Sequence, residues 1–85
     1  MKNLEIGTKY KHYKGHEYEV VGIARDSETL EEMVIYKALY KSEEFGDNIL
    51  WVRPKEIFLE NVTIDGQEVE RFQKVEQEIL IKPNK

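Results

Sequence analysis

Three short apolar runs, residues 18–24, 33–40 and 49–53, constrain the fold more than any other feature of this sequence. Each is rich in β-branched or aromatic residues and ends at turn-forming residues, which is typical of β-strands. Strands this short do not stand alone in water, so we expect them to be neighbours in one sheet. Residues 18–53 therefore predict the centre of an all-β domain.

The N-terminal half adds one strand and two connections to this centre. Residues 8–13 alternate lysines with Tyr10 and His12, which predicts a first strand paired antiparallel with 18–24 through a tight turn at Gly15. Gly22 inside a strand indicates a bend or bulge. Residues 25–32 contain short polar side chains that bond to local backbone, so we expect a structured loop there.

The C-terminal half contains a helical turn and a hairpin. Residues 54–58 begin with proline, which favours the first position of a short helical turn. Residues 61–64 and 67–72 are predicted strands, and the Asp65-Gly66 pair between them is a strong hairpin signal. We expect residues 73–85 to form a poorly packed or edge-capping tail.

These elements predict an all-β fold, either a small SH3-like antiparallel barrel or a strongly curled sheet of five to six strands. The sequence of strand, short helical turn and strand around 50–64 resembles an SH3-type barrel, which concerns the fold and not the function. We expect residues 1–85 to form a single domain, because 85 residues leave no room for a second.

Composition narrows the classes of function. The chain has no cysteine and two histidines, so we predict no thiolate chemistry, no metal site and no cofactor. Neither a signal peptide nor a run of about 18 apolar residues is present, which predicts a cytoplasmic protein without a membrane partner. The net charge of −4 makes nucleic acid an unlikely but possible partner.

The sequence Trp51-Val52-Arg53-Pro54 is the best candidate for a binding site. On an alternating strand Trp51 and Arg53 share a face, so an aromatic wall and a guanidinium lie side by side. This combination suits a planar anionic ligand. The alternative is a core tryptophan with Arg53 paired to a surface acid such as Glu28 or Glu56.

Two other patterns give alternative functions. Ser27 and Glu28, with His12, predict a small hydrolase, although no catalytic motif is present and we assign no catalytic residue. The lysines and aromatic residues of 9–16 predict an RNA or ribonucleoprotein accessory domain. The simpler interpretations are loop capping for Ser27 and an amphipathic strand for 9–16.

Several motifs together resemble a small bacterial family, domain of unknown function 1653. They include His12-Tyr13-Lys14-Gly15, Ser27-Glu28-Thr29, Trp51-Val52-Arg53-Pro54 and Arg71-Phe72. The resemblance covers residues 7–72, whereas the 41–48 loop is longer than usual and the tail lies outside the pattern. The resemblance implies a bacterial cytoplasmic protein and no particular activity, substrate or cofactor.

We therefore predict a non-catalytic binding module for a small anionic ligand or a peptide. The expected site lies where the first, third and fourth strands converge, with aromatic walls, an anion contact and polar groups for discrimination. Its candidate residues are His12, Tyr13, Lys14, Ser27, Glu28, Tyr36, Trp51 and Arg53.

Overall fold

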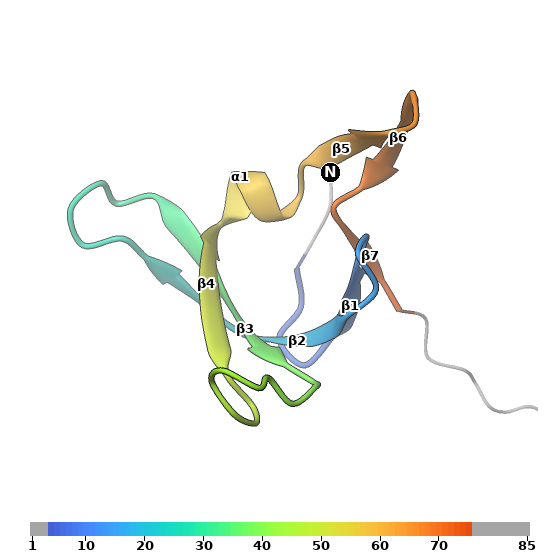
Figure 1. The fold of residues 1–85 in the computed structure, drawn as a ribbon. Coiled ribbons are helices and arrows are strands. Elements are labelled where there is room, and N and C mark those ends of the chain that lie inside the picture. Colours follow the sequence, from blue (N-terminus) through green and yellow to red (C-terminus); the bar gives the residue numbers. More distant parts are fainter. Residues whose placement is uncertain (1–3, 76–85) are drawn as a thin grey trace, which may run out of the picture.

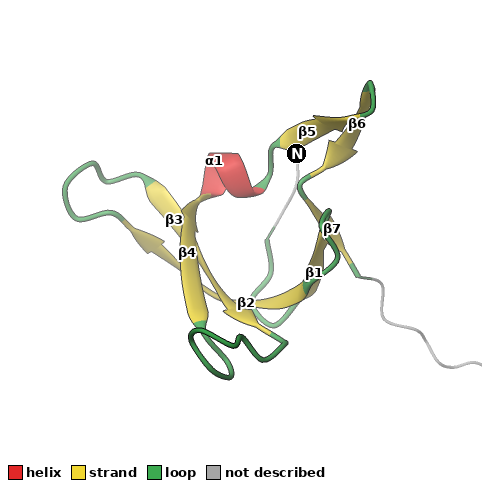
Figure 2. Cartoon of the chain, viewed as in Figure 1, coloured by secondary structure: helices red, strands yellow, loops and turns green. Residues whose placement is uncertain are grey.

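The protein is all-β with one short helix, in a computed structural model that describes residues 4–75 (Figures 1 and 2). The elements in chain order are β1 (Lys9–His12), β2 (Glu17–Arg25), β3 (Glu32–Ala38), β4 (Leu50–Pro54), α1 (Lys55–Phe58), β5 (Asn61–Ile64), β6 (Gln67–Glu70) and β7 (Phe72–Lys74). The predicted positions of the first four strands, the helical turn and the fifth strand are therefore confirmed.

Five of the strands form one antiparallel sheet in the order β4-β3-β2-β1-β7, and β5 pairs with β6 in a second, two-stranded sheet. Figure 1 shows the larger sheet curling so that β4 and β7 stand on opposite sides of its concave face, with α1 near the upper rim. The sheet is strongly curled. Among the described residues its two edge strands, β4 and β7, are not paired, so no closed barrel is seen.

The bulge predicted at Gly22 is present in β2. Val20 is opposite Tyr36 and Gly22 is opposite Ile35, so one extra residue of β2 lies between two consecutive positions of β3. Such a bulge increases the local twist of a strand. Because β2 and β3 are interior strands, this bulge contributes to the curl that forms the concave face.

The core lies on the concave face and is largely aromatic. Alternate residues of the curled sheet point inward, and Phe58 of α1 meets Phe72 of β7 in a stack with ring centroids 4.0 Å apart. The buried cluster consists of Tyr10, Val20, Val34, Tyr36, Phe58 and Phe72. In a chain this small such rings supply much of the apolar area that is removed from water on folding.

The predicted returning strand 67–72 is wrong in its last two residues. Residues 67–70 form β6 and pair with β5, but the chain bends at Arg71 and then continues as β7, which pairs with β1. The pairing of Phe72 with His12 is a contact between distant parts of the chain, which local patterns do not report. The sequence predicts a tail over residues 73–85. Its first two residues, 73 and 74, belong to β7 in the structure. Residues 76–85 of the predicted tail lie outside the described residues.

The hairpin between β5 and β6 has the predicted turn. Asp65 and Gly66 both have positive φ, 50° and 81°, as the two central residues of a type I′ turn require. Among residues 4–75 no helix has the length and apolar character needed to cross a bilayer. The cytoplasmic location stays a prediction.

Candidate ligand site on the concave face

Strand β4 places Trp51 and Arg53 side by side on the concave face. Trp51 is opposite Tyr36 of β3 and Arg53 is opposite Val34, and both of these β3 residues are buried inside the curl. Trp51 remains 38% exposed and meets Phe45 of the β3–β4 loop in an edge-to-face contact, with centroids 5.8 Å apart. The indole therefore borders the open part of the concave face.

The guanidinium of Arg53 turns inward onto aromatic rings. Its Nε donates a hydrogen bond to the Tyr36 hydroxyl at 3.1 Å, and its Cζ lies 5.5 Å from the centroid of the Phe72 ring. Among residues 4–75 no ion pair joins Arg53 to Glu28 or Glu56, the acids considered as alternative partners. The terminal nitrogens of Arg53 thus have no carboxylate partner within this part of the chain.

His12 lies against the same phenylalanine from the neighbouring strand β1. Its Cα partner across the β1–β7 ladder is Phe72, and the two ring centroids are 4.8 Å apart. The His12 Nδ1 accepts the Lys14 amide N–H at 3.1 Å, which places the proton of the neutral imidazole on Nε2. His12 therefore offers one ring N–H as a donor.

Four basic side chains act on the His12 imidazole, although Glu68 and Glu70 also line the hollow beside it. Partial burial lowers its pKa below 6.5, and the nearby Arg53, Arg71, Lys14 and His16 lower that pKa further because each disfavours a second positive charge. A lowered pKa beside several bases makes the region around His12 a candidate for contact with an anion.

Arg71 also belongs to this cluster, although the spacing of single residues did not predict it. It occupies the bend between β6 and β7, where its carbonyl accepts the Tyr13 N–H at 3.0 Å and its side chain pairs with Glu60 at 3.2 Å. Its Nε is buried without a hydrogen-bond partner. The only signal in the sequence was its place in the Arg71-Phe72 motif of the family resemblance.

Tyrosines line the concave face beyond Arg53. The hydroxyls of Tyr18 and Tyr40 are 3.2 Å apart, and burial together with this hydrogen bond raises the pKa of Tyr18 far above its usual value. His16 stacks on the Tyr40 ring with centroids 3.9 Å apart. A shallow cleft of about 670 Å³ opens beside this stack, between His16 and Tyr40 and the loop residues Lys41 to Glu44.

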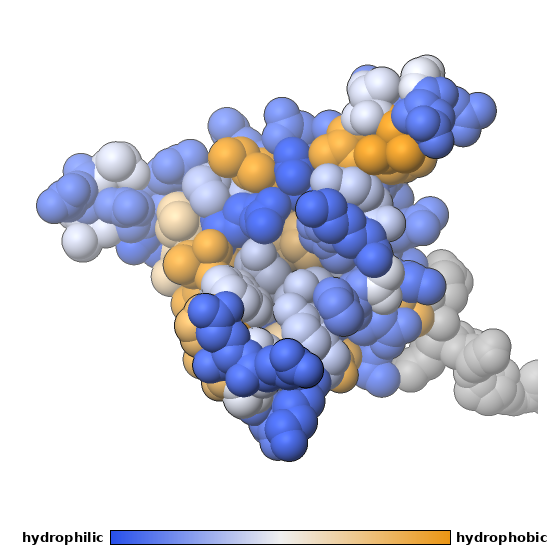
Figure 3. Space-filling view, in the orientation of Figure 1, coloured by the Kyte–Doolittle hydropathy of each residue, from blue (hydrophilic) through white to orange (hydrophobic). Residues whose placement is uncertain are grey.

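A second hollow, of about 600 Å³, lies between β1 and the β5–β6 hairpin. His12 and Tyr13 form one wall, and Ile64, Val69 and Glu68 are among the residues on the other. Figure 3 shows apolar side chains gathered beneath this hairpin and along the β4 side of the molecule. Tyr13 is 38% exposed, with the Lys14 Nζ 5.9 Å from its ring, so both residues lie outside the core.

Ser27 and Glu28 lie far from His12. They occupy the turn between β2 and β3, whereas β1 pairs with the first residues of β2, at the other end of that strand. A nine-residue strand separates the two ends, which is roughly 25 Å at about 3.3 Å per residue. Figure 1 shows this turn projecting away from β1. The residues named for a hydrolase are therefore not assembled.

The β2–β3 turn has its own internal hydrogen bonds. The Asp26 carboxylate accepts the N–H groups of Glu28 at 2.8 Å and Thr29 at 3.2 Å, and these bonds lower the pKa of Asp26. The Thr29 hydroxyl accepts the Glu31 N–H at 3.2 Å. This is the loop capping that short polar side chains provide. Within residues 4–75 no three histidine, aspartate or glutamate side chains gather as a metal site requires.

The fold and this site define a small curled-sheet domain with basic and aromatic side chains on its concave face. Residues 8–74 match the family described as protein of unknown function DUF1653. The chain belongs to this family, as its motifs indicated. Its structure is similar to the crystal structure of a DUF1653 protein from Bordetella bronchiseptica, with 31% identity, 99% of each chain covered and a TM-score of 0.74. No curated protein matches the chain.

Proposed function

We propose that this protein is a non-catalytic binding module for a small anionic ligand, or for the carboxylate of a peptide. The site comprises Arg53, His12 and Lys14 for the anion, with Tyr36 and Trp51 as the aromatic wall. The observation that carries the proposal is the Arg53 guanidinium, which lies on the concave face against Tyr36 and Phe72 without a carboxylate partner among the described residues.

Electrostatics and aromatic contact support this proposal together. A half-buried guanidinium with free N–H groups binds carboxylates and phosphates through two parallel hydrogen bonds. The bases that surround His12 raise the local potential, although the whole protein is acidic. Aromatic rings beside such a charge favour a ligand that carries a flat apolar part as well as the anion.

The test is a binding assay with small aromatic anions, monitored by amide and indole NMR signals. We expect benzoate, benzenesulfonate or phenyl phosphate to shift the Trp51 indole N–H and the signals around His12 and Arg53. Arg53→Lys keeps the charge but removes the planar fork, so it should weaken binding about tenfold or more. Arg25→Lys is the matched control, because Arg25 lies at the β2–β3 turn and bonds to the Leu30 carbonyl.

Two results would contradict the proposal. One is an absence of binding by every anion in this set. The other is a set of shifts confined to Lys9 and Lys11 on the outer face of β1, equally affected by Arg25→Lys and Arg53→Lys. Circular dichroism of each variant controls for folding.

We infer that the domain is a relative of the SH3-type barrels and forms a single cooperative unit over residues 1–85. The support is the order β4, α1, β5 and the curled five-stranded sheet. One unfolding transition, coincident by tryptophan fluorescence and circular dichroism, is expected, and two separate transitions would contradict a single unit.

A further inference from the structure

We infer that the anionic group recognised at this site is the phosphate of a small phosphate monoester, with Arg53 and His12 as its direct contacts. This inference rests on the proposed function and names its ligand class. It follows from three features of the cluster around Phe72, which are its hydrogen-bond donors, its total charge and the acidic surface around it.

The cluster contains donors and few acceptors. The terminal nitrogens of Arg53 and the Nε2–H of His12 can only donate to a ligand. Donors that are partly withdrawn from water favour a ligand made of acceptors. Phosphate presents three strong acceptor oxygens, one more than a carboxylate offers.

Two positive charges at the cluster have no ion pair among residues 4–75. Arg53 lies against the Phe72 ring that His12 also contacts, and Lys14 follows His12 by two residues, whereas Arg71 is paired with Glu60. A phosphate monoester carries about −1.5 to −2 at pH 7, whereas a carboxylate or sulfonate carries −1. The two unpaired bases therefore favour the dianion.

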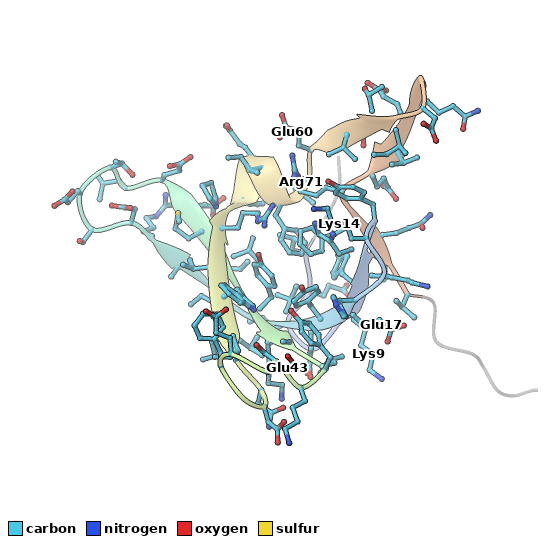
Figure 4. All side chains as sticks on the ribbon, viewed as in Figure 1. Lys9, Lys14, Glu17, Glu43, Glu60 and Arg71 are labelled. Carbon is cyan, nitrogen blue, oxygen red and sulfur yellow. The ribbon has the colours of Figure 1, made fainter. Side chains whose placement is uncertain are left out.

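The surrounding surface favours a small molecule over a nucleic acid chain. Acids lie beside the cluster on the hairpin, at Glu68 and Glu70, and at the far end of the concave face on the β3–β4 loop, at Glu43 and Glu44. Figure 4 shows Lys14 and Arg71 near Glu60 at one end of the concave face and Glu43 at the other. A long polyanion has to pass these carboxylates, while a single phosphate with a short organic part does not.

The organic part of the ligand can contact an aromatic surface beside the phosphate. Trp51 and the Tyr18–Tyr40 pair continue the concave face away from Arg53, with the Tyr18 ring 5.2 Å from that of Tyr36. A phosphate at Arg53 and His12 places its ester substituent along these rings. The ligand we infer is therefore a phosphate monoester with an aromatic or other flat group.

Calorimetric titrations at pH 7.5 test this inference. They compare three ligands, which are phenyl phosphate, benzenesulfonate and benzoate. We expect phenyl phosphate to bind at least tenfold more tightly than the two monoanions. His12→Asn keeps an acceptor for the Lys14 N–H but removes the ring donor. It should weaken phenyl phosphate about tenfold and benzenesulfonate less than threefold.

Two further measurements complete the test. The His12 ring signals, followed by NMR against pH, should show that phenyl phosphate raises the pKa of His12, since a bound dianion favours the imidazolium. Lys9→Ala is the matched control for loss of a positive charge. Lys9 is exposed on the outer face of the same strand and lies apart from Lys14 and Arg71 in Figure 4, so binding should be unchanged.

The outcomes separate this inference from the proposed function. Equal affinity for the three anions overturns the phosphate and leaves the binding module in place. Failure of all three to bind overturns the proposed function and the inference with it. Tighter binding of a 5′-phosphorylated RNA oligonucleotide than of phenyl phosphate, with a steep loss on addition of salt, overturns the choice of a small molecule.

Discussion

The concave cluster around Phe72 and the β2–β3 turn are both rich in polar side chains, yet their hydrogen bonds differ. In the turn, Asp26 and Thr29 bond to backbone N–H groups two or three residues away. In the cluster, Arg53 reaches from β4 to Tyr36 on β3, and its terminal nitrogens have no ion pair among residues 4–75. Polar groups that form hydrogen bonds within their own loop stabilise the conformation of that loop. Donors without a protein partner on a solvent-facing aromatic surface are available to a ligand.

Truncation of an aromatic ring gives the largest expected difference between the two regions. Phe72→Ala removes the stack on Phe58 and the contact with Arg53, and should cost about 3–5 kcal/mol of unfolding free energy. Leu30→Ala in the turn, where the side chain is 64% exposed, should cost less than about 0.5 kcal/mol. Urea denaturation measures both, and similar losses would contradict a core confined to the concave face.

Loss of a single hydroxyl has a smaller expected effect. Tyr36→Phe removes the acceptor of the Arg53 Nε–H bond and should cost about 1–2 kcal/mol, because a partly buried charged donor loses its partner. Tyr13→Phe is the control, since its ring lies near the surface and its change should stay within about 0.5 kcal/mol. An equal effect at both positions, measured by chemical denaturation, would show that the Tyr36 hydroxyl has no special partner.

Acidification should weaken the concave cluster more than the turn. Because the pKa of His12 is lowered in the folded protein, the unfolded chain binds its proton more readily. The contribution of His12 is therefore fully present above its unfolded pKa of about 6.5 and decreases as the pH falls through that value toward the folded pKa. His12→Asn should show a flatter loss of stability between pH 7.5 and 5.5, and added salt should reduce the difference. Parallel curves for the two proteins would mean that the basic neighbours do not act on His12.

The smallest expected effect is at Ser27. Ser27→Ala in the exposed turn should change the unfolding free energy by less than about 0.5 kcal/mol and leave the binding of phenyl phosphate unchanged. If Ser27 were the nucleophile of a hydrolase, the same substitution would abolish turnover. Turnover of an ester or phosphate substrate that this substitution abolishes would reverse our interpretation of both regions.

Local chemistry predicted most of the elements, because their signals lie within a few residues. Pro54 preceded α1, Asp65-Gly66 marked a type I′ turn, and Gly22 marked the bulge. The alternation of β4 also placed Trp51 and Arg53 on one face. In each case the physical cause, a fixed φ, a positive φ or the two-residue period of a strand, is present in the sequence itself.

The parts that were missed depend on contacts between distant segments. The bend at Arg71 exists because β7 leaves the hairpin to pair with β1, and no local pattern records that choice. The same pairing brings Arg71 and Phe72 to His12, so the basic cluster was only partly predictable. The grouping of Ser27 with His12 was suggested by residue type alone, and the length of β2 separates them.

The pairing of β7 with β1 has a consequence for synthesis of the protein. The concave cluster takes Arg53 from the middle of the chain, His12 from near its start and Phe72 from β7. During translation these partners cannot meet until residue 74 has left the ribosome, so a nascent chain exposes its aromatic side chains until that moment. The concave cluster thus forms late in synthesis, and a chain interrupted before β7 has a four-stranded sheet without the Phe72 ring that His12 and Arg53 contact.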